Sequence, residues 1–156
     1  MLPTEPNPLR TLRDIGEALR QDGLPHELHP SRGQIILPVE RGDLVSQLVL
    51  IWPGTHVLFQ ALLALPFEVP PGRLAPTALA IARINHVLTV PGFGLDPEHG
   101  TVYFRVVQPR RADGSIDKLE LQRACTTVVH TAADFLAPLL DVALHGASPD
   151  GVLRRP

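Results

Sequence analysis

The feature that most constrains this chain is an apolar stretch, Leu44–Pro66, in which two predicted β-strands meet at one turn. The strands are expected over Leu44–Trp52 and His56–Leu65. Pro53-Gly54-Thr55 joins them, because proline presets a turn φ angle and glycine tolerates a positive one. A chain of this kind is built around a β-hairpin.

Both predicted strands are apolar on both of their faces. On the first strand, Leu48 and Leu50 point one way and Val49 the other. On the second strand, Phe59 and Leu62 lie on opposite sides in the same manner. Such strands are typical of a sheet that is covered on both faces. We therefore expect helices over one face and a second layer of another kind over the other.

The length of the chain sets its domain organisation. A chain of 156 residues is long enough for one domain, which would bury roughly 70% of its unfolded surface. We predict a single domain over residues 9–146, with flexible tails over residues 1–8 and 147–156. Cys125 is the single cysteine, which excludes an intrachain disulfide.

Charge and hydropathy indicate which partners to expect. The formal net charge is −2 with mixed signs, so no broad basic field favours specific binding to nucleic acid. The first ten residues contain no apolar core of a signal peptide. No apolar run approaches the ~18–20 residues needed to span a bilayer. A cytoplasmic protein that binds no membrane is the expectation.

Helical periodicity predicts three helices. The first begins at Pro8-Leu9 and is closed by Gly23. The second is expected over Arg73–Val87. The third follows Asp117 and Glu120, which have the spacing of a capping box, and it should run to Leu144 with a bend at Pro138.

Three further strands complete the predicted sheet. Gln34–Glu40 precedes the central hairpin, and Pro38 within it indicates an edge position, because proline donates no ladder hydrogen bond. Phe93–Asp96 is expected to pair with Thr101–Gln108. The order α-βββ-α-ββ-α predicts an α+β fold, an antiparallel sheet flanked by helices.

A series of residues begins at the end of the second predicted helix and continues into the third. It consists of Ile84-Asn85, Gly92-Phe93-Gly94-Leu95-Asp96, Gly100, Val102-Tyr103-Phe104-Arg105, Ala133-Asp134 and Pro138. In this order, over residues 9–144, the chain resembles the YbjN-like family, whose fold is that of type III secretion chaperones. The resemblance implies a module without catalysis, usually homodimeric, whose activity is protein binding.

Candidate metal, nucleotide and nucleophile sites each have a simpler structural explanation. The histidines of His26-Glu27-Leu28-His29 are three residues apart between prolines, which predicts a surface loop rather than a zinc helix. Gly92 and Gly94 follow a helix, which indicates turn glycines. Cys125 lies on the apolar stripe of the last helix. His130 lies about 140° round that helix from it, so a buried, inert thiol is expected.

Asn85 lies on or near the apolar side of the second helix. A carboxamide there must find hydrogen-bond partners or cost roughly 1–3 kcal/mol. We predict that it bonds to the backbone of residues 91–95.

The functional expectation is a non-enzymatic, homodimeric chaperone-like or adaptor module that binds a protein client through an apolar surface and needs no cofactor. The last helix supports this, since Asp134 and Asp141 are its only charged residues between Ala124 and Leu144. Two alternatives stay open. One is a stress-response or sensory regulator acting with nucleic-acid-associated proteins. The other is a small-molecule sensor or enzyme with an apolar pocket.

Eight residues are the candidates for the dimer or client surface. The resemblance implies pairing through the second helix and adjoining strands, and the last helix is the competing surface. The candidates are Ile81, Ile84, Leu88, Val102, Phe104, Val129, Leu136 and Leu140.

Overall fold

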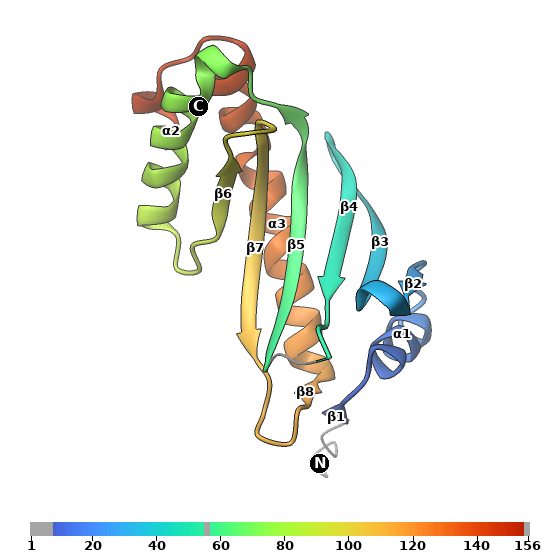
Figure 1. Cartoon of the computed structure of the whole chain (residues 1–156). Helices are drawn as coiled ribbons and strands as arrows, with labels where there is room; N and C mark the ends of the chain where they lie inside the picture. The colour runs from blue at the N-terminus through green and yellow to red at the C-terminus, as the bar shows by residue number, and fades with distance from the viewer. Residues whose placement is uncertain (1–7, 55–56, 155–156) are drawn as a thin grey trace.

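A computed structural model describes residues 8–54 and 57–154 and shows one six-stranded antiparallel sheet with helices beside it (Figure 1). The strand order is β2-β3-β4-β5-β7-β6. The chain is therefore α+β, as predicted. The strands in that order are β2 (Glu27–His29), β3 (Gln34–Arg41), β4 (Leu44–Ile51), β5 (Leu58–Glu68), β7 (Thr101–Pro109) and β6 (Phe93–Asp96).

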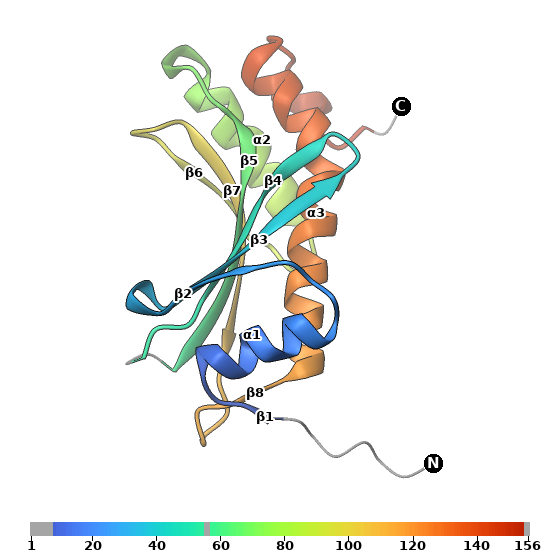
Figure 2. The same cartoon turned by 90° about the vertical axis from the view of Figure 1, so that its right-hand side faces the viewer.

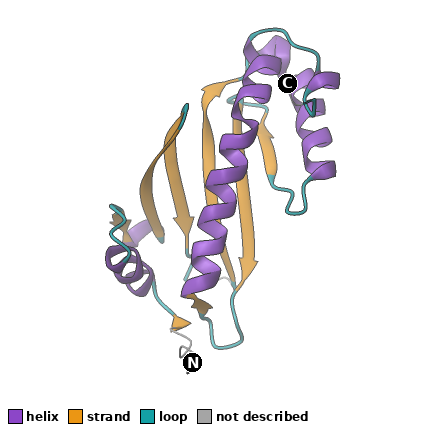
Figure 3. Cartoon of the chain, turned by 180° about the vertical axis from the view of Figure 1, so that it is seen from behind, coloured by secondary structure: helices purple, strands orange, loops and turns teal. Residues whose placement is uncertain are grey.

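The three α-helices lie on the same side of this sheet (Figures 2 and 3). The longest, α3 (Lys118–Leu144), runs across the back of the central strands. At one edge of the sheet α1 (Leu12–Gln21) lies near β2 and β3, and at the other α2 (Leu74–Val87) lies near β6. The described residues also form three short 3-10 helices: η1 (Pro30–Arg32), η2 (Pro71–Arg73) and η3 (Pro149–Gly151).

The hydrophobic core lies between the sheet and α3. Side chains that point toward α3 are fully buried, among them Leu50 of β4, Phe59 of β5 and Phe104 of β7. From α3, Leu139 is fully buried as well. Alternate residues of the same strands are only half-buried, which is the two-residue period of a strand with one covered face.

The expectation that both faces of the sheet are covered is wrong for the single chain. Within residues 8–54 and 57–154, no helix or strand lies over the face opposite α3 (Figure 2). Both sides of β4 and β5 carry apolar residues, as predicted. However, periodicity cannot show on which side each helix returns, and all three return on one side.

The central hairpin differs from its predicted bounds. β4 ends at Ile51, and β5 begins at Leu58 and continues through Pro66 to Glu68. The predicted turn includes Thr55 and the predicted second strand begins at His56, and both residues lie outside the described part. β5 is longer than predicted because its last residue, Glu68, still pairs with Thr101 of β7.

The first helix begins later than predicted. Thr11 caps it: the backbone N–H of Asp14 donates to Thr11 Oγ1 (3.1 Å), and the N–H of Thr11 donates to Asp14 Oδ2 (2.9 Å). Leu9 instead belongs to β1 (Pro8–Leu9), which pairs with β8 (Ile116–Asp117). This long-range pairing is invisible to helical periodicity.

The prediction for Pro38 needs one refinement. β3 is second in the sheet, because β2 pairs with its first three residues, Gln34–Ile36. β2 then ends, so β3 has no neighbour on that side at Pro38 in the described part of the chain. The proline therefore lies at a true edge, as its missing N–H requires.

Several boundaries agree with the predictions. α2 covers the predicted range to within one residue, and β6 and β7 form the predicted hairpin. α3 begins with the predicted capping box, in which the N–H of Asp117 donates to Glu120 Oε2 (2.6 Å). The helix continues through Pro138 and ends at Leu144, two residues before Gly146, whose φ of 73° is left-handed.

The segment after Gly146, for which the sequence predicts a frayed end, lies against α2. Val152 is buried, and Arg83 of α2 pairs with Asp150 at 2.7 Å. Ser148 Oγ accepts a hydrogen bond from the N–H of Asp150 and so caps η3.

By length and composition, α3 is the one described helix apolar enough to cross a membrane, with a mean hydropathy of 1.4 in its most apolar window. Core helices pass the same test. Eight residues of α3 are buried in the fold, so we assign it to the core: Leu121, Ala124, Val128, Ala132, Leu136, Leu139, Val142 and Ala143.

Candidate protein-binding surfaces

Most of the residues predicted to form an interface are part of the core of a single chain. Ile81, Ile84, Val102 and Phe104 are all buried, and Leu88 is half-buried against them. Apolar periodicity marks a core face and an interface face in the same way, which explains the misplacement. These residues shape the fold rather than present a surface.

Of the three predicted interface residues on α3, one packs against the core and two line a groove. Val129 is half-buried against the core. Leu136 and Leu140 line a groove of about 470 Å³ beside the turn between β3 and β4, and we name it the turn groove. Its other lining residues are Arg41, Gly42, Asp43, Leu44, Pro66, Ala133, Asp134 and Ala137.

The turn groove exists because the sheet splits there. The ladder between β4 and β5 runs from Ile51–Gln60 to Leu48–Leu63 and then stops. Beyond it, Ser46 Oγ donates a hydrogen bond to the carbonyl of Ala64 (2.6 Å), in place of a backbone ladder bond. Beyond this point β4 and β5 diverge (Figure 1).

A second and larger groove, of about 1160 Å³, lies between α3 and the C-terminal segment, and we name it the terminal groove. Asp134 and Ala137 line both grooves, so the exposed side of α3 forms a strip between them. The remaining lining residues are Val87, Phe135, Pro138, Asp141, Val142, Ala147, Ser148, Asp150, Gly151, Val152, Leu153 and Arg154.

This strip of α3 is acidic. Asp141 contacts His145 Nδ1 at 2.9 Å, whereas Asp134 has no ion-pair partner among the described residues. Pro138 has no N–H to donate to the carbonyl of Asp134, four residues earlier. The side-chain carboxylate and the backbone carbonyl of Asp134 can therefore both accept hydrogen bonds from a partner.

Arg73 holds the end of α3 in place. Its guanidinium donates to the carbonyl of Val142 from Nε (2.9 Å) and Nη2 (2.7 Å), and Nη2 also donates to the carbonyl of Ala147 (2.9 Å). A cation at a helix C-terminus satisfies its last carbonyls and the negative end of its dipole. The wall of the terminal groove is thereby fixed to η2.

Asn85 makes the contacts predicted for it. Its Nδ2 donates to the carbonyl of Phe93 (2.9 Å), and its Oδ1 accepts from the N–H groups of Gly92 (3.2 Å) and Phe93 (3.0 Å). Gly92 must be glycine for a second reason, since an added Cβ would lie 2.2 Å from the carbonyl oxygen of Arg105. Asn85 thus sets the start of β6.

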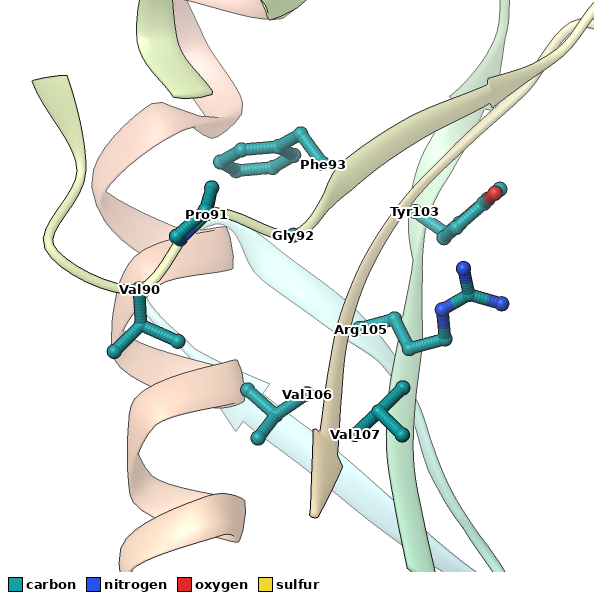
Figure 4. Close-up of a pocket in the computed structure, with 8 residues that line it drawn as sticks. All are labelled: Val90, Pro91, Gly92, Phe93, Tyr103, Arg105, Val106 and Val107. Atoms are coloured by element: carbon teal, nitrogen blue, oxygen red, sulfur yellow. The ribbon is translucent and has the colours of Figure 1, made fainter. Parts of the chain in front are cut away.

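A small pocket of about 300 Å³ lies where β6 begins (Figure 4). The last bond between the strands joins the N–H of Arg105 to the carbonyl of Gly92 (3.0 Å). Figure 4 shows Val106 on the α3 side of β7 and Tyr103 and Arg105 on the other. Among the described residues that line this pocket, Arg105 is the only charged one. The described lining therefore contains no carboxylate or histidine that could form an acid–base pair with it.

Within the described part of the chain, Cys125, His29 and Arg110 show no arrangement typical of a catalytic or metal site. Burial raises the pKa of the Cys125 thiol to about 12, as expected of an inert cysteine. His29 lies in β2, and no group of three or more His, Cys, Asp or Glu within residues 8–54 and 57–154 could hold a metal. Arg110 stacks on the ring of Trp52 at 3.7 Å and donates to the carbonyl of Pro53.

We name the sheet face opposite α3 the open face. None of the eight residues predicted for the interface lies on it. Its apolar side chains are half-buried or exposed, and Ile36, Val49, Ile51 and Leu62 lie outside the hydrophobic core. The signal for it was present, since both sides of β4 read as apolar. Its apolar members are Ile36, Val45, Val49, Ile51, Leu58, Leu62, Ala64, Tyr103 and Val107.

Comparison with known proteins decides the family. The sequence profile of YbjN, described as a "Putative bacterial sensory transduction regulator", matches residues 11–141. The chain belongs to the YbjN family. The YbjN match begins at the cap of α1 and ends in the last turn of α3, so it includes the whole six-stranded sheet, Asn85 and the acidic strip. Among curated proteins no match was found.

Proposed function

We propose that this YbjN-family protein is a non-enzymatic regulator that acts in the cytoplasm as a homodimer and binds a client protein, in the manner of a chaperone or adaptor. One observation carries the proposal. The strip of α3 around Asp134 and Ala137 lies between two grooves, each lined mainly by apolar residues. The arrangement is compatible with a type III secretion chaperone-like fold.

The chemistry of the strip favours one class of client segment. Leu136, Leu140 and Phe135 supply apolar lining, and Asp134 and Asp141 supply acidic acceptors. A segment that alternates apolar and Lys or Arg side chains complements both. An amphipathic helix laid along α3 would place its apolar side chains in the grooves and its cations beside the carboxylates.

The size of the terminal groove favours a peptide over a small molecule. Its volume of about 1160 Å³ is above the roughly 300–1,000 Å³ of most small-ligand sites. The family description as a sensory transduction regulator also supports a protein partner, because a regulator must pass its state to another molecule. A bound metabolite is the second candidate, and the experiment distinguishes the two.

The test is a capture experiment with matched variants. Immobilised wild-type protein is compared with Ala137→Arg, which fills the strip and offsets part of its negative charge, and with Thr126→Arg, an exposed control on the same helix. Proteins retained from host lysate are quantified by mass spectrometry, and each candidate client is then purified and titrated by calorimetry.

We expect a client that binds the wild type and Thr126→Arg equally and binds Ala137→Arg at least tenfold more weakly. Equal retention of every protein by all three forms would contradict the proposed site. Retention of nothing above bare resin, together with a metabolite that co-purifies with the wild type, would favour the sensor instead.

A further inference from the structure

We infer that the open face is where two copies of this chain meet, sheet against sheet, about a two-fold axis parallel to the strands. The inference deepens the homodimer part of the proposed function and rests on it. The open face lies on the opposite side of the sheet from α3, so the dimer and the client site can fail independently.

The strand register gives the pattern of the open face. Neighbouring strands place one row of side chains across five strands, in the order Glu27, Ile36, Val49, Leu62 and Arg105. The next row is His29, Gln34, Ile51, Gln60 and Val107. On the other side of the first row, the face continues with Pro38 on β3, Gln47 on β4, Ala64 on β5 and Tyr103 on β7.

These rows are left unpacked by the chain itself. Val107 is 44% exposed, and Val45 near the far end of β4 is 61% exposed. Ile36, Val49 and Leu62, the aliphatic residues of the first row, do not belong to the hydrophobic core. They are half-buried only because neighbouring side chains of the sheet cover them. Soluble monomers rarely expose a contiguous apolar face of this extent.

The area of the face is sufficient for a dimer. Five strands spaced about 4.8 Å apart and three rows about 6.8 Å apart give a footprint of about 500 Å² per copy. Two copies would therefore bury about 1,000 Å² in total, the lower limit for a specific interface. Two twisted sheets that pack face to face keep their strands aligned to within about 30°.

Charge selects the occupant. The first row carries an acid at one end, Glu27, and a base at the other, Arg105, with three aliphatic residues between them. The Glu27 side chain is 78% exposed, and its Oε2 lies 3.4 Å from Nε2 of His29 in the same strand. Arg105 is exposed, with its guanidinium 5.7 Å from the Tyr103 ring centre. A row that is acidic at one end and basic at the other is complementary to its own reversed copy.

The same pattern specifies the axis. A two-fold axis between the sheets and parallel to the strands reverses the order of strands but keeps each row at its own height. Glu27 then lies over Arg105 of the second copy, and Ile36 lies over Leu62 of the second copy. An axis across the strands at this row would instead set Glu27 over Glu27 and Arg105 over Arg105, which like-charge repulsion disfavours.

The first experiment measures mass by light scattering at micromolar concentrations. We expect the wild type at about twice the chain mass of 17.0 kDa. Val49→Lys, at the centre of the row, should have the single-chain mass with an unchanged far-ultraviolet circular dichroism spectrum. Leu79→Lys, at a 45% exposed position on α2, should stay dimeric.

The second experiment reverses the charges and leaves the aliphatic residues in place. Glu27→Arg should weaken dimerisation roughly tenfold, since two facing pairs become repulsive. Adding Arg105→Glu should restore it. Both positions are exposed, so the folded state is retained, and thermal unfolding checks this.

Three results would overturn the inference. They are a wild-type mass near 17.0 kDa at about 100 µM, a Val49→Lys variant that stays dimeric, and a double charge reversal that binds no better than the single one. None of them affects the capture experiment with Ala137→Arg, which tests the client site alone.

Discussion

At the scale of single residues, Asn85 shows how one side chain determines where a strand begins. It lies near the end of α2 and satisfies three backbone groups of Gly92 and Phe93. Those groups belong to the start of β6, which has no strand on its other side in the described chain. Without the carboxamide they would need water in a half-buried position.

We therefore expect Asn85→Ala to lower the free energy of unfolding by about 1–3 kcal/mol. The neighbouring His86→Ala, at an exposed position, should change it by less than about 0.5 kcal/mol. Urea denaturation followed by circular dichroism measures both. Equal effects of the two substitutions would show that the hydrogen bonds of Asn85 contribute nothing specific.

Cys125 gives a prediction about reactivity. Because burial raises the pKa of its thiol to about 12, the nucleophilic thiolate is scarce at pH 8. We expect native protein to react with a disulfide reagent far more slowly than protein unfolded in guanidinium. Rates within a factor of about three would show that burial does not protect the thiol, and a native rate above the unfolded one would show an activated thiol and weaken the non-enzymatic proposal.

At the scale of elements, the central hairpin carries the core through one side of each strand. Leu50 of β4 and Phe59 of β5 are fully buried, while Val45 of β4 points to the open face. The same strands therefore contain residues with a large and a small expected effect on stability, only a few positions apart.

Replacing Leu50 or Phe59 with Ala should destabilise the fold by roughly 2–5 kcal/mol, because each leaves a cavity under α3. Val45→Ala is the matched control on β4 and should cost less than about 1 kcal/mol in the monomer. Chemical denaturation of the three variants measures the difference. A loss below about 0.5 kcal/mol at both Leu50 and Phe59 would contradict the strand register.

The same scale explains why α3 can be both a core helix and a docking surface. Its inner side fills the core, and its last turn is held by Arg73 from η2. Its outer side around Ala137 lies between two grooves because β4 and β5 separate after Leu48–Leu63. Because the end of α3 is already fixed, the strip would not have to become ordered when a partner binds.

At the scale of the whole molecule, electrostatic contacts tie the N-terminal elements to the start of α3. Lys118 and Gln122 of α3 donate to Asp22 at 2.6 and 3.0 Å, and Arg10 donates to Asp113 at 3.0 Å. The hydrogen bond from Lys118 lowers the pKa of Asp22, and the side chain of Ser115 lowers that of Asp113. The backbone N–H of Arg10 lowers the pKa of Asp14.

These lowered pKa values make stability depend on pH with a definite sign. A carboxyl whose pKa is lower in the folded state stabilises that state above its unfolded pKa of about 3.9, and the contribution is lost as the pH falls through the folded value. We expect the melting temperature to fall from pH 5 toward pH 2.

Asp22→Asn isolates one of these groups. It should melt below the wild type at pH 7, and the difference should shrink toward zero at low pH, where Asp22 of the wild type is also uncharged. Differential scanning calorimetry at both pH values measures this. A difference that stays constant with pH would mean that the Asp22 contact acts through geometry rather than charge.

The two proposed surfaces also belong to this scale, because the sheet separates them. The open face and α3 lie on opposite sides of the sheet (Figure 2). A dimer formed through the open face would therefore hold two client sites that face outward. Such an arrangement allows both sites to be occupied together.

Local patterns in the sequence were enough to determine much of this protein. The capping residues of α3, the span of α2, the β6–β7 hairpin, the edge at Pro38 and the role of Asn85 all depend on residues near one another in the chain. Each is decided by backbone preferences or by a side chain that reaches only a few residues away.

The tertiary structure alone decided which apolar residues are core and which form a surface. Ile81 and Phe104 are buried by α3 and the sheet, whereas Val49, equally apolar, is left on the open face. Periodicity shows that two sides of a strand differ, but the side that becomes buried depends on where the helices pack. That placement is set by contacts across the whole chain, such as the pairing of Leu9 with Ile116.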